Sequence, residues 1–584
     1  MLVEVGPVAD EPTLERVLGV ARALAAALLP GVTDIVPSFN TVTVHYDPAA
    51  IPAGPGAPVA RVAEWLRLTA ATAKPIPGVP GREVVVPVCY GGEFGPDLTA
   101  VARRAGMEEA EVIRLHSSVR YRVAAVGFAP GFPYLLGLPL RLHMPRRANP
   151  RVSVPMGSVG IGGSQTGVYP FATPGGWQLI GRTPLRFFRP ESRLPSLLYP
   201  GDYLRFKPIA ASEWAEGPPA EAPQPGPDKP TGLSKWTRLI PRRAASAPAK
   251  LPAAEAVPAV AVTEPLVPEG AVEIVRVAGL AIIQDLGRTG WQRVGVTPGG
   301  AMDRQAARVA NLLLGNPENA PLLECALAGP DLSFHAETWI TVTGAAVEGV
   351  AGWRPLRMAA GTQLSLAKLT RGAHLYVAVA GGFAVPSLLG GAGTLLRAGF
   401  GGFHGRALRA GDRLVVGPRT GSLGAGRGDW AAAWEFWTAH GSEVTVRFVR
   451  GRRWPAFDEA ARTAFKTAAW RIGPQSDRMG LRLSGPVLTA ALPGELISSG
   501  VTFGSVQVPP NGQPIVLMAD RQTLGGYPKI AHVIAADLPR LAQVRPGDTV
   551  RFAEIPVAEA QALAAEMEKS LALLRLGVAA KLRG

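Results

Sequence analysis

Cysteine is scarce in this sequence. Cys89 and Cys325 are the only two cysteines among 584 residues, and they stand far apart. A disulfide framework or a cysteine zinc site is therefore not expected, and the 8 histidines are too scattered to suggest a metal cluster. Such cysteine usage is typical of a reducing compartment, so we expect a cytoplasmic protein without a metal site of its own.

Targeting signals and long apolar runs are also missing. Residues 1–10 carry Glu4 and Asp10 in place of the basic and apolar pattern of a signal peptide. The longest early apolar stretch, residues 17–29, is interrupted by Arg22 and is too short to span a bilayer. We therefore expect no membrane partner.

Several signatures of cofactor chemistry are absent as well. The sequence has no G-x-x-x-x-G-K-[ST] phosphate loop, no clean G-x-G-x-x-G after a strand and no Met-Lys-Met biotin acceptor. Ser158 lies in GSVGIGG, which is not the G-x-S-x-G elbow of a hydrolase nucleophile. The glycine-rich runs at 390–393 and 399–405 are therefore interpreted as loops and not as nucleotide cradles.

Acidic residues are fewer than basic ones, which gives a net charge of +15. The arginines are spread through Gly, Ala and Pro without a basic block, so the charge does not indicate a nucleic-acid partner. Residues 98–118 resemble a helix-turn-helix with Gly106 at the turn, but the second helix opens with Glu108 and Glu109. Carboxylates oppose binding to phosphates, so we predict two structural helices.

Glycine and proline are abundant, with 69 and 56 residues. Such turn-rich content favours many short strands. Residues 209–270 consist mainly of Pro, Ala, Glu and Lys without a periodic apolar pattern, which predicts a linker. Near the N-terminus, apolar residues recur at helical spacing from Leu14 to Leu28, with Thr13 as the predicted N-cap, and residues 41–46 alternate like a strand.

A repeated motif connects the two sides of the linker. The run YPGDYLRF at 199–206 resembles RPGDTVRF at 545–552 and, more loosely, RAGDRLVV at 409–416. Each predicts a tight turn that leads into the closing strand of a β-rich module. We therefore predict a mainly β fold with α+β elements. The predicted division is a small α+β domain at 1–75, a barrel at 82–208, the linker at 209–270, barrels at 271–420 and 443–556, and a C-terminal helix at 557–584.

Two regions are candidates for a ligand site. Residues 127–177 concentrate glycines, which allow a ligand to approach the backbone closely, with guanidinium, amide and phenol groups that could bind and orient it. Turns of a β-barrel would give the same composition, and both interpretations stay open. Residues 518–529 gather polar and ionisable groups between two apolar strands, which favours a ligand floor over an Asp–Arg pair that fixes a turn.

These motifs resemble a known family. Residues 3–208 are similar to the B subunit of 5-oxoprolinase, also called the Kip-type kinase inhibitor and allophanate hydrolase subunit 1, through GFAPGFPYL, PRRANPR, VPMGSVGIGGSQTGVYP and PGGWQLIGRTP. Residues 272–552 are similar to the C subunit, also called the Kip-inhibitor antagonist and allophanate hydrolase subunit 2, through QDLGRTGWQ, GGAMD, GPQSDRMG and IVLMADRQTLGGYPKIA. The pair also resembles the carboxyltransferase region of urea carboxylase. The resemblance implies cyclophilin-like β-barrel modules in both halves.

The resemblance further implies hydrolysis of 5-oxo-L-proline to L-glutamate. ATP with Mg²⁺ would be the co-substrate, biotin would not be covalently bound, and the partner would be a separate 5-oxoprolinase A subunit of the LamB/YcsF type. Under this hypothesis some side chains would hold a carboxylate or phosphate, others would orient the substrate, and two would manage protons. These are, respectively, Arg146, Arg151 or Arg521; Gln165, Tyr169, Gln522 and Tyr527; and Asp520 and Lys529.

Two other functions stay open. The same modules could transfer a carboxyl group from biotin delivered by another protein, or the chain could regulate a histidine kinase without catalysis. The sequence also leaves homo-oligomerisation open.

Overall fold

The computed structural model describes residues 1–75, 82–215, 272–418, 430–433, 441–491 and 496–583. Most of the predicted linker lies outside these residues. Its first part forms α5 (Ala211–Ala215), where the Trp214 ring lies 4.9 Å from the Phe94 ring. None of the described helices is long and apolar enough to span a membrane.

The first module is a small α+β domain in which two helices cover a sheet of order β1-β3-β2. Helix α1 begins after Asp10, whose carboxylate accepts a hydrogen bond from Thr13 N at 2.9 Å. The predicted cap at Thr13 is therefore wrong, because the stronger acceptor lies one turn earlier and Pro12 suits the first turn. The elements are β1 (Leu2–Glu4), α1 (Glu11–Ala26), β2 (Val32–Ser38), β3 (Thr41–Tyr46), η1 (Pro48–Ala50) and α2 (Pro58–Thr72).

The second module is a closed barrel of order β11-β4-β12-β5-β6-β9-β8, with β7 and β10 as a separate antiparallel ribbon. Closure leaves these strands no free edge. The bounds are β4 (Glu83–Tyr90), α3 (Leu98–Ala105), α4 (Glu109–Ser117), β5 (Arg120–Val126), β6 (Pro133–Leu136), η2 (Leu140–Leu142), β7 (Arg151–Val154), β8 (Ser158–Gly162), β9 (Gln165–Val168), β10 (Thr173–Gly175), β11 (Gln178–Arg182) and β12 (Tyr203–Pro208).

Helices α3 and α4 pack on this barrel, as expected of structural helices. Leu98, Val101 and Val112 belong to the barrel core, and Gly106 ends α3 in the left-handed conformation. At the end of α4 the buried His116 lies between Tyr90 Oη, 2.8 Å from Nδ1, and Thr166 Oγ1, 3.0 Å from Nε2. The helix pair therefore closes one end of the barrel core.

Replacing His116 by Gln should make this barrel less sensitive to acid. Burial lowers the pKa of His116 from 6.5 to about 3. Since the unfolded chain binds a proton near its ordinary pKa, the native barrel loses stability as the pH falls from 6.5 towards 3. Thermal unfolding at about pH 7 and about pH 5 checks this, with the wild-type advantage over His116→Gln shrinking at the lower pH. An advantage that does not change with pH would contradict the prediction.

Residues 271–420 were predicted to form a barrel, but the described strands of 272–414 form two open sheets over one core. We call this two-sheet module the sandwich. The sheets have orders β19-β16-β13-β21 and β14-β15-β20-β17-β18. Edge strands β19 and β21 have only three and two residues, too few hydrogen-bonding groups to join the sheets. The bounds are β13 (Val272–Arg276), β14 (Leu280–Gln284), η3 (Gln292–Val294), α7 (Arg304–Leu313), β15 (Leu322–Ala326), β16 (Asp331–Phe334), β17 (Thr338–Val347), β18 (Pro355–Met358), β19 (Gln363–Ser365), β20 (Leu369–Val379), η4 (Leu396–Ala398) and β21 (Arg413–Leu414).

The last module is a second closed barrel, of order β22-β29-β26-β27-β24-β23-β30, followed by helix α10. Closed barrels in both halves confirm the predicted fold class. The bounds are β22 (Glu443–Arg450), η6 (Trp454–Ala456), α8 (Glu459–Thr467), β23 (Trp470–Ile472), β24 (Gly480–Ser484), β25 (Ser499–Gly500), β26 (Ser505–Gln507), β27 (Ile515–Leu517), β28 (Leu524–Gly525), β29 (Lys529–Val533), η7 (Ala535–Asp537), α9 (Leu538–Ala542), β30 (Thr549–Glu554) and α10 (Val557–Arg583).

The repeated Gly-Asp motif occupies equivalent places in the two barrels. The motif at 199–206 leads into β12, which pairs in parallel with β4, the first strand of its barrel. The motif at 545–552 leads into β30, which pairs in parallel with β22 in the same way. These two copies therefore mark closing strands, whereas the looser copy at 409–416 leads into β21, an edge strand that pairs antiparallel with β13 in an open sheet.

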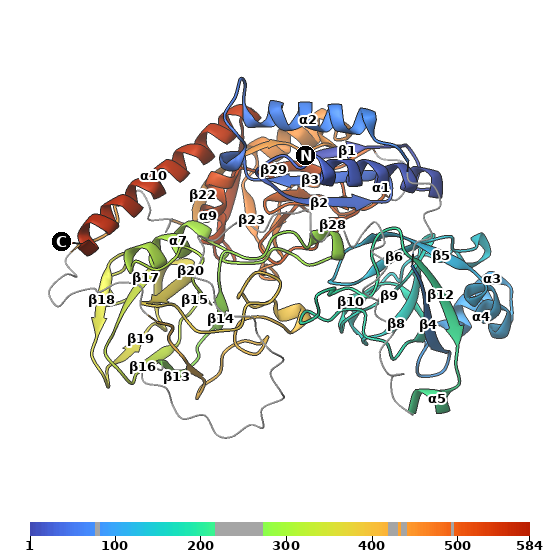
Figure 1. The fold of residues 1–584 in the computed structure, drawn as a ribbon, viewed down its shortest axis with the longest axis horizontal. Helices are drawn as coiled ribbons and strands as arrows, with labels where there is room; N and C mark the ends of the chain where they lie inside the picture. The colour runs from blue at the N-terminus through green and yellow to red at the C-terminus, as the bar shows by residue number, and fades with distance from the viewer. Residues whose placement is uncertain (76–81, 216–271, 419–429, 434–440, 492–495, 584) are drawn as a thin grey trace.

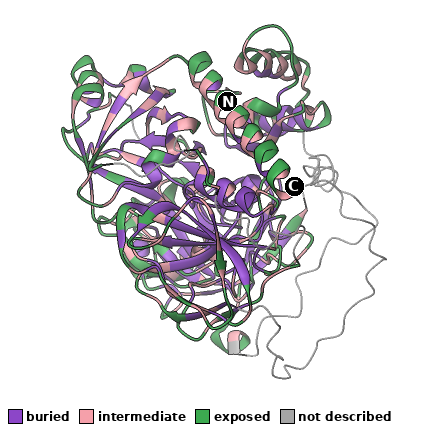
Figure 2. Cartoon of the chain, turned by 90° about the vertical axis from the view of Figure 1, so that its left-hand side faces the viewer, coloured by how far each residue is buried: buried purple, intermediate pink, exposed green. Residues whose placement is uncertain are grey.

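The two halves of the chain are interleaved (Figure 1). The N-terminal domain lies on the second barrel, where Ser38 Oγ donates to Ser498 O at 2.8 Å. Helix α10 also holds this domain, since the Gln561 side chain bonds Val59 N and Tyr46 Oη. Further along, Leu571 of α10 is fully buried with residues of α7 and the sandwich. Buried residues concentrate along the strands and the inner helix faces (Figure 2).

Candidate functional site

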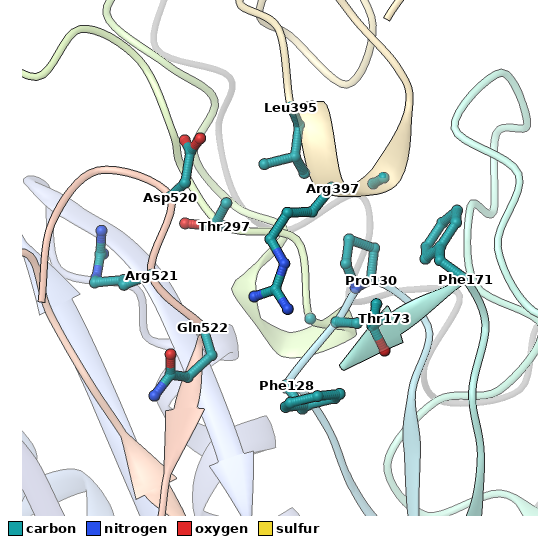
Figure 3. Close-up of a pocket in the computed structure, with 13 residues that line it drawn as sticks. Phe128, Pro130, Phe171, Thr173, Thr297, Leu395, Arg397, Asp520, Arg521 and Gln522 are labelled. Carbon is teal, nitrogen blue, oxygen red and sulfur yellow. The ribbon is translucent and has the colours of Figure 1, made fainter. Parts of the chain in front are cut away.

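A narrow cleft lies where the first barrel meets both modules of the second half (Figure 3). One wall is largely apolar and the other carries charged and amide groups, an arrangement typical of small-molecule sites. Phe128, Ala129, Pro130, Phe171 and Thr173 come from the first barrel; Gly295, Thr297, Leu395, Arg397 and Ala398 come from the sandwich; Asp520, Arg521 and Gln522 come from the second barrel.

The apolar wall is rigidly supported. Phe128 has a positive φ of 66°, which is rare outside glycine, so the surrounding structure must hold it in place. Its ring packs edge to face on Phe132 at 5.3 Å and on Tyr169 at 6.3 Å. Tyr169, a predicted substrate-orienting residue, therefore lies behind the wall, and burial raises its pKa to about 12.

Arg397 is a cleft residue that the sequence patterns did not reveal. It lies in η4, between the two glycine-rich runs that were interpreted as loops, and its guanidinium group points into the cleft (Figure 3). Burial lowers its pKa, while Asp477 and Asp520 act in the opposite direction. Among the described residues no carboxylate forms an ion pair with it, and the guanidinium group contacts Met479 Sδ instead. An arginine flanked by two glycine-rich runs was the signal that could have identified it.

Asp520, Arg521 and Gln522, which are adjacent in sequence, line the cleft together. Arg521 is almost fully buried, its Nε has no partner among the described residues, and its nearest bond is to Gln292 Oε1 at 3.5 Å. Burial first, and then Arg304, lower its pKa to about 9, against the opposing effect of Asp520. Gln522 contacts Gln507 at 3.4 Å. The cleft therefore contains two guanidinium groups, of Arg397 and Arg521, that form no ion pair with any described carboxylate.

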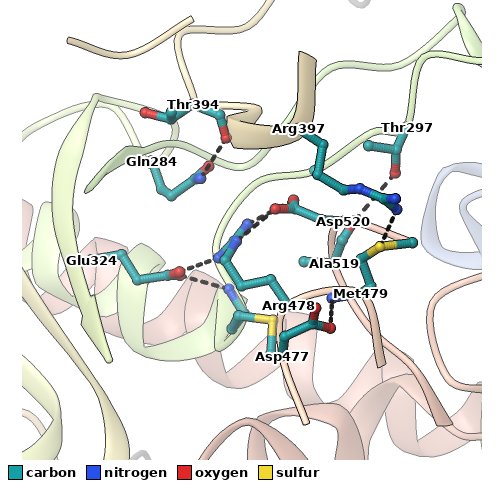
Figure 4. Close-up of polar contacts among 12 residues, drawn as sticks. Gln284, Thr297, Glu324, Thr394, Arg397, Asp477, Arg478, Met479, Ala519 and Asp520 are labelled. Carbon is teal, nitrogen blue, oxygen red and sulfur yellow. Dashed lines mark hydrogen bonds and ion pairs between the residues drawn. The ribbon is translucent and has the colours of Figure 1, made fainter. Parts of the chain in front are cut away.

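Asp520 takes part in a buried ion network (Figure 4). Its two oxygens accept bonds from Arg478 at 2.8 and 3.0 Å, and Arg478 also pairs with Glu324. Glu324 in turn accepts bonds from Tyr376 Oη at 2.9 Å and from Met302 N at 2.8 Å. Arg478 lies in the GPQSDRMG motif, which served in the sequence only as a family marker. The network joins the sandwich to the second barrel directly beside the cleft.

Lys529 and Tyr527 do not line the cleft. Lys529 Nζ donates to Ser499 Oγ at 2.9 Å and to Gly525 O at 3.1 Å, and no carboxylate of the described residues pairs with it. Burial, with Arg452 and Arg453, lowers its pKa to about 8. Tyr527 is 41% exposed at the surface.

The predicted residues of the first barrel also lie outside the cleft. Arg151 pairs with Asp97 at 2.8 Å, and Arg147 pairs with the same carboxylate at 3.1 Å. Arg146 is exposed. Burial raises the pKa values of Tyr134 and Tyr169 and the charge of Arg146 opposes this rise, so Arg146 lies near the cleft's aromatic support. Gln165 is half-buried in β9.

The described residues contain no group of three or more His, Cys, Asp or Glu that could hold a metal ion.

Comparisons with known proteins identify both halves. Residues 1–198 match the family model of carboxyltransferase domain, subdomains C and D, and residues 294–554 match subdomains A and B. The chain is 40% identical to the 5-oxoprolinase C subunit of Escherichia coli over 295 residues, which cover 49% of this chain and 92% of that protein. It is 44% identical to the 5-oxoprolinase B subunit of Bacillus subtilis over 208 residues, covering 34% and 87%.

A solved structure also matches along nearly the whole length. The protein TTHA0988 is 32% identical, with a TM-score of 0.74, and the match covers 95% of this chain and 99% of that one. The chain thus belongs to the carboxyltransferase-domain family of the 5-oxoprolinase B and C subunits, with the sequences of both joined in one polypeptide.

Proposed function

We propose that this chain is the B–C component of an ATP-dependent 5-oxoprolinase that opens 5-oxo-L-proline to L-glutamate together with a separate A subunit. The observation that carries the proposal is the origin of the cleft, because its walls come from both halves of the chain, one similar to the B subunit and the other to the C subunit. A site assembled in this way would be complete only when the two halves are docked.

The lactam would bind with its flat ring on the apolar wall and its carboxylate on Arg397. Guanidinium groups suit carboxylates, and Arg397 reaches into the cleft without a carboxylate partner of its own among the described residues. Gln522 and Thr173 would orient the amide. ATP would activate the lactam carbonyl, and the buried arginines would stabilise negative charge that develops there.

Asp520 and Lys529 would act differently from one another. Since Arg478 binds both oxygens of Asp520, we assign Asp520 to positioning the segment that carries Arg521 and Gln522. Lys529 is connected to this segment through Gln507, which contacts Gln522 and packs on Gly525. Because Lys529 does not line the cleft, we assign it to accepting the proton of the attacking water through one bridging water molecule.

Replacing Lys529 by Gln should lower kcat by about 10²–10⁴-fold. Because the pKa of Lys529 is lowered to about 8, its neutral, proton-accepting form accumulates as the pH rises through that value. We therefore expect kcat/KM of the assembled wild-type enzyme to rise as the pH increases towards 8. In the variant, this rising limb of the pH profile should be absent. Lys368→Gln, at an exposed surface ion pair, is the control. A variant that keeps the limb would remove Lys529 from this role.

The proposed function is tested by 5-oxoproline-dependent release of ADP and glutamate, with and without a cognate A subunit. Glutamate that forms only when both proteins are present would support the activity and the partner together. An assembled complex that does not turn over 5-oxoproline would refute the proposal and favour carboxyl transfer. Failure to assemble would refute it and favour a regulatory function.

A further inference from the structure

The loop at 285–288 contacts both segments of the sandwich that line the cleft. These segments are 295–297 and 395–398. A backbone bond ties the loop to the end of the first segment, because Arg288 N donates to Pro298 O at 2.8 Å. The loop belongs to the motif QDLGRTGWQ, which served in the sequence only as a family marker.

Two buried side chains of this loop bind the chain just before the second segment. Asp285 is 5% exposed, and its two oxygens accept bonds from Gly287 N at 2.7 Å and Ala392 N at 2.6 Å. Arg288 is 2% exposed and donates to Gly393 O. Bonds to an ionised group are about twice as strong as bonds between neutral groups, so these contacts hold the backbone at 392–393 firmly.

Thr394 provides a further fixed point before Arg397. Its backbone N and its Oγ1 both donate to Ile283 O, at 2.9 and 2.8 Å, and its carbonyl oxygen accepts a bond from Gln284 Nε2 at 2.9 Å. Arg397 follows in η4, and its guanidinium group reaches into the cleft (Figure 3). The anchored residues 392–394 therefore set the position from which η4 presents Arg397.

The two glycine-rich runs on either side of η4 allow this close approach. A Cβ at Gly393 would lie 2.8 Å from Asp285 Oδ1 and 2.4 Å from Gln284 Oε1. A Cβ at Gly401 would lie 2.2 Å from Gly393 O. Only glycine fits at such positions, so close packing around the 285–288 loop explains these glycines.

We propose that Asp285 is a positioning residue, which holds the segment 391–402 so that Arg397 meets the carboxylate of the ligand. The inference rests on the proposed function, in which Arg397 binds the carboxylate of 5-oxoproline. Asp285 is not among the described residues that line the cleft, so it acts through the segment and does not touch the ligand. Guanidinium groups recognise carboxylates through bonds of defined geometry, and a displaced segment therefore costs affinity.

Hydrogen–deuterium exchange of the full chain, followed by mass spectrometry, measures the positioning directly. In Asp285→Ala, peptides from 391–402 should exchange about tenfold faster than in the wild type, because charge-assisted bonds to the backbone are lost. Calorimetric titration measures the consequence, and the Kd of 5-oxoproline should rise about tenfold. Asp331→Ala is the control that should change neither quantity, since Asp331 bonds Arg276 and Ser365 within the sheet β19-β16-β13-β21.

A double variant separates positioning from general damage to the fold. Arg397→Gln alone should raise the Kd of 5-oxoproline about tenfold or more. Asp285→Ala should add nothing to this loss when the two are combined, because its effect passes through Arg397. Additive losses would show that Asp285 affects binding by another route and would overturn the inference. Asp285→Asn keeps one accepting oxygen and should show smaller changes in the same direction, so it replaces the alanine variant if that variant does not fold.

Three further outcomes would overturn the inference. They are unchanged exchange of 391–402 in both Asp285 variants, an unchanged Kd in both, and a wild-type chain that binds no 5-oxoproline. The exchange measurement needs no ligand, so failure of the proposed function can be recognised separately. If the complex with the A subunit does not hydrolyse 5-oxoproline while 391–402 exchanges faster in Asp285→Ala, the proposed function fails and the positioning of Arg397 by Asp285 stands.

Discussion

Replacing Arg478 by Met should destabilise the second barrel and its joint with the sandwich by about 3–5 kcal/mol and abolish turnover of the assembled enzyme. Arg478 is 7% exposed and stands between Asp520 and Glu324, so its loss leaves two buried carboxylates facing each other. Urea unfolding followed by tryptophan fluorescence measures the loss. Because the chain has several modules, the transition to compare is the one that includes Trp470, which is buried in the second barrel.

Two further variants make this result specific. Arg482→Met, on the exposed side of β24, should change stability by less than about 0.5 kcal/mol. Adding Asp520→Asn and Glu324→Gln to Arg478→Met should recover part of the stability without recovering activity, because the charges are removed but the bonds that fix the 520–522 segment are not restored. A fully stable or fully active Arg478→Met variant would contradict the proposed role of the network.

Replacing Gly295 by Ala should separate the two halves. Gly295 has a φ of +79°, and a Cβ there would lie 2.3 Å from Ala129 O in the first barrel. The added methyl group therefore meets backbone of the other half, where no side-chain rotation can relieve the contact. We expect residues 1–215 and 272–584, produced as separate chains, to associate about tenfold to a hundredfold more weakly in the variant, as overpacking by about 1–3 kcal/mol implies.

Gly361 provides a closely matched control. Its φ is +80°, but a Cβ there meets nothing within 4 Å. Gly361→Ala therefore carries the same left-handed backbone strain, about 1–2 kcal/mol, without the contact between halves. Analytical ultracentrifugation of the mixed halves should find this variant assembled and Gly295→Ala largely dissociated. Equal association of both variants would show that the Ala129 contact does not control docking.

Local patterns were enough to predict much of the fold. The Gly-Asp repeat marked the closing strands because a tight turn before a strand is encoded within a few residues. The open sandwich at 272–414 was not predicted, because closure depends on how many hydrogen bonds the edge strands can exchange. Similarly, the competition between Asp10 and Thr13 for the cap of α1 depends on where the chain turns, and helix ends are the least certain part of such predictions.

The candidate site was predictable only in part. Asp520, Arg521 and Gln522 are neighbours in sequence and line the cleft together, and Phe128 and Pro130 fall in a run that was selected for its glycines and prolines. Arg397 was missed because it is distant in sequence from these residues, and only the fold brings it close to them. The roles given to Arg146, Arg151, Gln165, Tyr169 and Tyr527 remain predictions, since none of these side chains lines the cleft.

The parallel pairing of first and last strands decides how these barrels can be assembled into longer proteins. In each barrel the first and last strands run in the same direction, so the chain enters at one pole and leaves at the opposite pole. A strand of six residues advances about 20 Å, so the two ends of the chain in each barrel lie roughly that far apart. Gene duplication or fusion can append such a unit in line, without threading a new segment through an existing sheet. A single polypeptide that joins sequences similar to the B and C subunits is compatible with this geometry.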